Sequence, residues 1–255
     1  MIKKQIPNIF TLLNLLSGLI AIIMALSDRL VEAAFFVMLG IFFDFFDGFF
    51  ARIFNVQGEF GKQLDSLADV VTSGVVPGIV MFQLLLNATK QQWFMEMSYE
   101  LGKWTTFEQS NLQILPFFGL IIPLASAYRL AKFNIDERQT DSFIGLPTPA
   151  FALFVVSLPL ILNYSDKQFF IELINNKYIL IAITIIGSFL LNAELPLFSL
   201  KFKNYSLKNN ILKYLFLTIT LILIFTLKTV AVPIIIIVYI LLSVFENSQK
   251  KTPIK

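Results

Sequence analysis

The chain has 255 residues, of which 56% are hydrophobic and only 15% are charged, and its mean hydropathy is +0.75. This composition excludes a disordered chain and disfavours a soluble domain, because soluble domains carry about 25% charged residues. The chain has no cysteine and no histidine, which excludes disulfides, thiolate or histidine metal sites and a histidine general base. The net charge of +3 is small, and we expect no nucleic-acid partner. Acid–base or metal chemistry must therefore depend on carboxylates.

Long apolar runs predict an all-α, polytopic bundle of about eight transmembrane helices. A helix that spans a bilayer needs about 20 mostly apolar residues. Such runs occur near residues 7–27, 30–53, 65–86, 113–131, 149–163, 177–194, 212–228 and 230–246. We expect one integral membrane domain over residues 1–255, with its core at about 7–203. The last two runs predict a tight helical hairpin at about 212–246.

Basic residues are distributed unevenly between alternate loops, which predicts that both termini face the cytoplasm. With that orientation, 14 of the 20 Lys and Arg residues lie on the cytoplasmic side, as the positive-inside rule requires. The turn between the second and third runs is then cytoplasmic. The polar stretch 87–112, which contains Trp93, Tyr99 and Trp104, is expected to be an amphipathic segment at the outer surface.

Four aspartates occur in or beside the second and third runs. Asp44 and Asp47 lie inside the phenylalanine-rich second run, although an ionised Asp at the centre of a membrane helix costs about 2.5–3.5 kcal/mol. Asp65 and Asp69 are one helical turn apart at the start of the third run. Each pair shares one helical face, and a short turn containing Gly58 allows the two faces to meet near the inner surface. Ionisable residues inside a membrane indicate a functional site.

The four aspartates predict a site for two divalent metal ions, Mg²⁺ or Mn²⁺. Four carboxylates in one pocket repel one another unless cations neutralise them, and both ions prefer carboxylate oxygens. Two ions held by shared carboxylates can stabilise the attacking and leaving oxygens of a phosphoryl transfer. Gly48 and Ala51 leave space beside the ions, Gly61 lies on the same face as Asp65, and Arg52 can bind phosphate oxygens.

Two other interpretations of the aspartates stay open. They could cap helices or pair structurally with Arg52 and Lys62. They could also form a cation or proton pathway in a transporter, or belong to a non-enzymatic lipid scaffold.

Eight of these residues follow the pattern Asp-x2-Asp-Gly-x2-Ala-Arg-x8-Gly-x3-Asp-x3-Asp; they are Asp44, Asp47, Gly48, Ala51, Arg52, Gly61, Asp65 and Asp69. The pattern resembles the signature of the CDP-alcohol phosphotransferase family of integral membrane enzymes. The resemblance implies that an acceptor hydroxyl attacks the phosphorus of a CDP-linked substrate and that CMP leaves. It also implies that Asp44 and Asp65 bridge both metals, that Asp47 binds the first metal, and that Asp69 binds the second and acts as general base.

The resemblance further implies a binding site for CDP-diacylglycerol. Its residues would be Gly48, Ala51, Arg52 and Gly61, together with Asn8 and Thr11 from the start of the first run. An alternative for Asn8 and Thr11 is a structural role, in which they begin the helix and bond back to its own backbone.

Four segments outside the signature resemble the membrane-type phosphatidylserine synthases of this family; they are residues 7–14, 128–134, 143–150 and 196–203. This likeness implies L-serine as acceptor, a homodimer, and a multi-pass protein of a prokaryotic cytoplasmic membrane with its active site facing the cytoplasm. A second route to phosphatidylserine uses phospholipase D-like histidine motifs, which a chain without histidine cannot use.

Three residues at or just beyond the cytoplasmic end of the fourth run are candidates for binding serine or a lipid phosphate, namely Arg129, Lys132 and Asn134. Serine brings a carboxylate that needs a cationic partner. Alternatively, the two basic residues only anchor the cytoplasmic end of a span. Glycerol 3-phosphate and an inositol phosphate stay open as other acceptors, and the segment 145–149 could shape the acceptor pocket.

Overall fold

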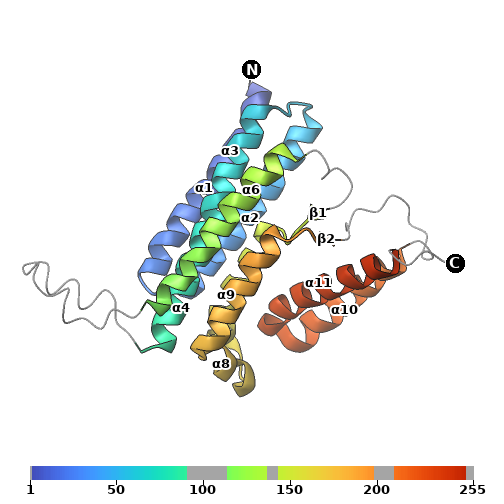
Figure 1. The fold of residues 1–255 in the computed structure, drawn as a ribbon. Helices are drawn as coiled ribbons and strands as arrows, with labels where there is room; N and C mark the ends of the chain where they lie inside the picture. The colour runs from blue at the N-terminus through green and yellow to red at the C-terminus, as the bar shows by residue number, and fades with distance from the viewer. Residues whose placement is uncertain (1, 91–113, 137–142, 198–209, 251–255) are drawn as a thin grey trace, which may run out of the picture.

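The computed structural model describes residues 2–90, 114–136, 143–197 and 210–250, and it consists almost entirely of helices (Figure 1). The N-terminal half contains α1 (Ile2–Leu26), α2 (Leu30–Ile53), α3 (Glu59–Asp69), the π-helix η1 (Val70–Val75), α4 (Val76–Ala88), the 3-10 helix η2 (Leu115–Leu120) and α6 (Ile121–Ile135). The C-terminal half contains α7 (Thr148–Tyr164), α8 (Gln168–Ile174), α9 (Lys177–Asn192), α10 (Ile211–Leu227), the 3-10 turn η4 (Lys228–Val230) and α11 (Ala231–Lys250). Two short strands, β1 (Phe143–Ile144) and β2 (Pro196–Leu197), pair antiparallel. The predicted all-α class is confirmed.

The count of possible membrane spans is lower than the sequence predicts. Four helical segments of the described chain are long and apolar enough to cross a membrane; they are Gln5–Leu26, Leu30–Ile53, Glu59–Ala88 and Ile211–Asn247. A fifth results if α8 and α9, which meet at an angle of 73°, form one span. Helix α7 is apolar but shorter, and the 3-10 helix η2 precedes α6. The structure therefore supports four or five spans, and the eight spans and the orientation stay predictions.

Hydropathy also misplaces the start of the third span. The helix begins at Glu59, six residues before the predicted start at residue 65, and continues through η1 into α4. The first turns of α3 carry polar residues that an apolar run cannot reveal, although they pack beside α1. The predicted outer segment lies outside the described residues from residue 91 to 112, as do residues 198–203 of the last resemblance segment.

Helix α1 holds the site-bearing helices together. It packs along α2 and against α3, η1 and α4, and its backbone lies closer to both α2 and α3 than these two lie to each other. The ring of Phe10 on α1 packs 5.0 Å from that of Phe50 on α2. Gly18 allows α1 and η1 to approach each other closely, because a β-carbon on Gly18 would lie 2.4 Å from Thr72 Oγ1 on η1. Helix α6 also packs against α3 (Figure 1).

Helices α10 and α11 form a hairpin beside this bundle (Figure 1). Helix α11 contacts α7 and β2. Near its end, the side chain of Asn247 donates a hydrogen bond to the carbonyl oxygen of Pro196.

Candidate active site

The structure brings the four predicted aspartates together. One carboxylate oxygen from each of Asp44, Asp47 and Asp65 lies within 4.8 Å of the other two. Asp69 lies alongside, where its charge interacts with those of Asp65 and Asp47. The helical spacing explains this arrangement, because α2 and α3 each present two aspartates on one face.

Helix α1 supplies polar partners for two of the aspartates. Thr11 Oγ1 donates a hydrogen bond to Asp47 Oδ2 at 2.6 Å, and it also lies 3.2 Å from the carbonyl oxygen of Pro7 in its own helix. A hydroxyl has one proton, and the shorter contact directs it to Asp47. Thr11 thus faces the aspartate cluster, as its candidate role requires.

Asn14 is a site residue that the sequence analysis did not single out. Its side chain is completely buried, and Nδ2 donates a hydrogen bond to Asp69 Oδ1 at 3.1 Å. The hydroxyl of Thr72 on η1 donates to the backbone carbonyl of Asn14 at 3.1 Å. The available signal was its position three residues after Thr11, on the same face of α1, in an otherwise apolar stretch.

The aspartates fit a divalent-metal site. Their oxygens come from two helices and converge at distances that ions can bridge, and Asp65 Oδ1 is buried with no hydrogen-bond partner among the residues that the structure describes. Carboxylate oxygens are the ligands that Mg²⁺ and Mn²⁺ prefer. Without cations, mutual repulsion and burial would both oppose ionisation of the cluster.

The structural-pairing alternative receives no support from the basic residues it needs. Arg52 Nε donates to the backbone carbonyl of Gly48 at 2.9 Å, and Lys62 Nζ donates to the backbone carbonyl of Asn134 at 2.6 Å. Within the described part of the chain, the ion pairs are Arg29–Glu32 and Lys132–Glu194. The four aspartates are therefore not neutralised by ion pairs with these basic side chains.

The two glycines of the signature border open space. A β-carbon on Gly48 would meet nothing closer than Arg52 Nη2 at 3.9 Å, and one on Gly61 nothing closer than Asn8 Oδ1 at 3.7 Å. Helix packing therefore does not require glycine at either position, whereas a ligand that approaches the helix backbone would. Ala51 is only partly buried and also has little side-chain bulk.

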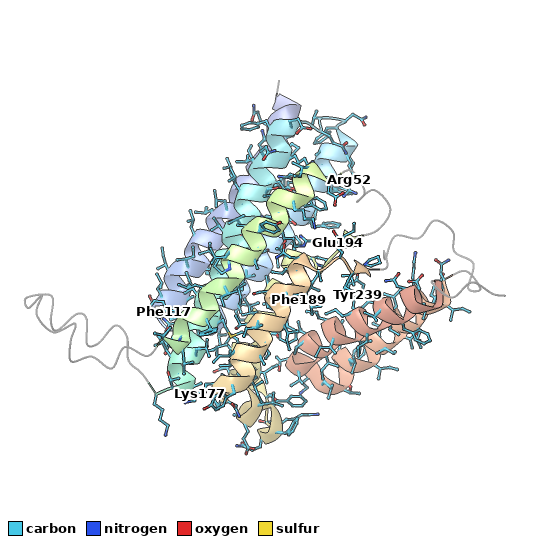
Figure 2. All side chains as sticks on the ribbon, viewed as in Figure 1. Arg52, Phe117, Lys177, Phe189, Glu194 and Tyr239 are labelled. Carbon is cyan, nitrogen blue, oxygen red and sulfur yellow. The ribbon has the colours of Figure 1, made fainter. Side chains whose placement is uncertain are left out.

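Arg52 and Asn8 flank this open space. The Arg52 side chain is exposed near the end of α2 (Figure 2), and the amide of Asn8 donates to Gln5 Oε1 at 3.3 Å. Figure 2 shows Lys177, at the start of α9, toward the opposite end of the molecule.

Arg129 connects the aspartates with a separate pocket. Its side chain is buried, its charge interacts with that of Asp69, and Nη1 donates to Thr148 Oγ1 at 3.3 Å. The guanidinium carbon also lies 5.9 Å from the ring centre of Phe133. Thr148, at the first position of α7, belongs to the segment 145–149 that the sequence analysis considered for the acceptor pocket.

The pocket lies where α6, β1 and the end of α9 meet. Its lining residues are Arg129, Lys132, Ile144, Leu191, Asn192 and Ala193. Gly145 adopts a φ of +76°, and a β-carbon there would lie 2.5 Å from the carbonyl oxygen of Leu191, so this turn requires glycine. The turn after β1 thus packs on α9, and Ile144 of β1 lines the pocket.

The other two residues predicted to bind serine or a lipid phosphate, Lys132 and Asn134, differ in their placement. Lys132 lines the pocket and pairs with Glu194 at 3.5 Å, and Figure 2 shows Glu194 just beyond the end of α9. Asn134 instead links α6 to α3, because its Nδ2 donates to Ser66 Oγ at 2.9 Å and its backbone carbonyl accepts from Lys62. Arg129 and Lys132 therefore share a pocket from which Asn134 is separate.

Comparison with known proteins matches this architecture to one family. The model of the CDP-alcohol phosphatidyltransferase family matches residues 4–190. A CDP-diacylglycerol–serine O-phosphatidyltransferase of Bacillus subtilis is 33% identical over 63% of this chain and 78% of its own length. One from Helicobacter pylori is 32% identical over 84% of this chain and 80% of its own length. An archaetidylserine synthase of Methanothermobacter thermautotrophicus is 27% identical over 71% of this chain and 66% of its own. The chain belongs to the CDP-alcohol phosphatidyltransferase family.

Proposed function

We propose that this protein transfers the phosphatidyl group of CDP-diacylglycerol to the hydroxyl of L-serine, which yields phosphatidylserine and CMP. The observation that carries the proposal is the juxtaposition of the aspartate cluster with the Arg129 pocket. Arg129 lines the pocket and its charge interacts with that of Asp69, which links the proposed acceptor pocket to the phosphoryl-transfer site. The names of the Bacillus subtilis and Helicobacter pylori relatives support serine as acceptor.

The aspartates are the residues that would hold two Mg²⁺ or Mn²⁺ ions. In this proposal Asp44 and Asp65 would serve as ligands of both ions, Asp47 of the first and Asp69 of the second. When bound, such ions neutralise the pyrophosphate of the lipid substrate and stabilise the negative charge of the transition state. Thr11 orients Asp47 through its 2.6 Å hydrogen bond.

The protein groups then have distinct tasks. Asp69 takes the proton from the serine hydroxyl, whose oxygen forms a bond to the phosphorus that carries diacylglycerol. The bond from that phosphorus to CMP breaks, and CMP leaves with the electron pair. Arg52 binds the nucleotide phosphates beside Gly48, Ala51 and Gly61, with Asn8 at the edge of this space. A general base is needed because the hydroxyl is scarcely ionised near pH 7, and it contributes about 10²–10⁴-fold to the rate.

The basic pocket would hold the acceptor. Arg129 is desolvated and lies beside Asp69, so a serine carboxylate bound to its guanidinium would keep the hydroxyl near the base. Lys132 contributes positive charge at the same pocket. Asn134 stays a weaker candidate, because its amide nitrogen already bonds to Ser66.

We further propose the membrane arrangement that this chemistry needs. The chain would be one integral, multi-pass domain with about eight spans, with both termini and the active site on the cytoplasmic side of a prokaryotic membrane. Its core would be residues 7–203, and the hairpin at 212–246 would pack against lipid. A homodimer is expected from the family resemblance.

An acceptor panel on the purified full-length protein tests the function. CMP release from CDP-diacylglycerol is measured with serine, glycerol 3-phosphate and an inositol phosphate, each offered singly, with and without Mg²⁺ or Mn²⁺. We expect metal-dependent release with serine alone. Release with only one of the other acceptors would support the reaction type and show that the acceptor is not serine. Metal binding without any CMP release would instead favour a transporter or scaffold.

A further inference from the structure

We infer that Asn192 determines specificity for an amino-acid acceptor, because its side-chain carbonyl accepts a hydrogen bond from the ammonium group of the substrate. The inference rests on the proposed function, since it assigns a second contact to the acceptor in the Arg129 pocket. Asn192 is the last residue of α9 and lines that pocket.

Hydrogen bonds fix the orientation of the Asn192 amide. Its Nδ2 donates to the backbone carbonyl of Ala125 at 3.0 Å and lies 3.5 Å from that of Ser188. Both partners can only accept, so the nitrogen must face them and the oxygen must face away. Asn192 Oδ1 is buried and has no hydrogen-bond partner among the described residues.

Arg129 presents the complementary unsatisfied group. Its Nε is a buried donor without a partner in the described part of the chain, and its side chain lines the same pocket. Ala125 and Arg129 are one turn apart on α6, so the hydrogen bond to Ala125 holds Asn192 on the Arg129 side of that helix.

An α-amino acid satisfies both groups together. Its carboxylate matches the cationic donor on Arg129, and its ammonium group matches the acceptor on Asn192. Buried polar groups are normally paired, so a ligand that fills both is favoured over one that fills only the cationic site. Glycerol 3-phosphate carries negative charge for Arg129 but no cation for Asn192.

Glu194 is the competing partner for the ammonium group, because its carboxylate lies just beyond Asn192. It pairs with Lys132 at 3.5 Å, and its side chain is largely exposed. An ammonium bound there would remain in solvent and would compete with Lys132. The buried side-chain carbonyl of Asn192 therefore distinguishes an acceptor with an ammonium group from one without it better than the exposed carboxylate of Glu194 does.

The test compares serine with glycerate, in which a hydroxyl replaces the ammonium group. CMP release by the purified full-length protein gives kcat/KM for each acceptor in vesicles that contain CDP-diacylglycerol. Asn192→Leu is expected to lower the ratio of serine to glycerate by about 10-fold or more, while the KM for CDP-diacylglycerol stays the same. Ser188→Ala is the matched control, since it removes a buried hydroxyl one turn earlier on α9 that has no hydrogen-bond partner in the described segments, and its ratio should equal that of wild type.

Further variants separate the possible outcomes. Asn192→Ala removes the same side-chain carbonyl without adding bulk, so it should lower the ratio as Asn192→Leu does; this variant decides the question if Asn192→Leu does not fold. An unchanged ratio in Asn192→Leu or Asn192→Ala, or a loss that follows Glu194→Gln instead, would overturn the inference. Wild-type protein that releases no CMP with serine would refute the proposed function itself.

Discussion

The helices around the aspartates and the C-terminal hairpin differ in how they pair their polar groups. In the hairpin, Thr218 and Thr226 donate to carbonyl oxygens of their own helix at 2.9 and 2.8 Å. In the bundle, Thr11 and Asn14 on α1 donate to aspartates on α2 and α3. Local pairing allows a polar residue to face lipid, whereas pairing between helices fixes a side chain at a defined point. A polar residue inside a membrane helix therefore indicates a site when its partner lies on another helix.

Loss of a bridging carboxylate should have the largest effect. Asp65→Asn removes one negative charge from the cluster whose oxygens lie within 4.8 Å. If the ions contribute several kcal/mol to transition-state stabilisation, CMP release should fall by about 10⁴-fold or more. Binding of Mn²⁺, measured by electron paramagnetic resonance, should weaken in parallel. Chelation of wild-type protein should abolish release, and added Mg²⁺ should restore it; full activity after chelation would refute the metal site.

Loss of the general base should be nearly as severe. Asp69→Asn keeps the size of the side chain but cannot take a proton, so kcat should fall by about 10²–10⁴-fold. Single-turnover CMP release with saturating serine measures this step. Near-normal turnover would remove Asp69 from the role of base.

Arg129→Ala should act mainly on the acceptor. It removes the buried guanidinium beside Asp69 and Thr148, and kcat/KM for serine should fall by about 100-fold. The KM for CDP-diacylglycerol should change little. An equal loss for both substrates would indicate that Arg129 supports the fold of the site and does not bind serine.

Asn14→Leu should have a smaller effect, because it leaves every proposed metal ligand in place. The Asp69 carboxylate would lose its 3.1 Å hydrogen bond, and kcat should fall by about 10-fold. Ser17→Ala is the control, since the Ser17 hydroxyl bonds to its own helix at Leu13. If both variants lower kcat equally, the hydrogen bond between Asn14 and Asp69 has no specific role in catalysis.

Thr226→Val should have the smallest effect. The substitution keeps the shape of the side chain and removes a hydroxyl that bonds to the backbone carbonyls of Ile222 and Leu223 in its own helix, α10. We expect CMP release within about twofold of wild type, as for substitutions away from special features. A large loss would show that the hairpin takes part in the reaction.

Spacing along the chain predicted the centre of the site. Asp44 and Asp47, and again Asp65 and Asp69, repeat at helical intervals, and a short turn joins their helices, so local rules suffice to bring them together. Thr11 became a candidate through the family resemblance, which implies contacts from the start of the first run. The all-α class followed from the long apolar runs.

The other features of the site and the fold depend on contacts between residues far apart in the sequence, which the sequence analysis could not predict. Asn14 and Asp69 are 55 residues apart, and Asn192 and Ala125 are 67 apart, so no local pattern reveals either pair. The span count depended on the 3-10 helix before α6 and the bend between α8 and α9. Hydropathy reports how apolar a stretch is, and it contains no information on where the helix axis changes direction.

The π-helix η1 sets the phase of the third span. It begins directly after Asp69 and accommodates an extra residue relative to an α-helix. If the same residues closed into regular α geometry with none deleted, Asp65 and Asp69 would turn by about 100° relative to α4. All four aspartates would then still be encoded, yet half of them would face the wrong neighbour. The position of this π-helical turn is therefore as important for the site as the acidic residues themselves.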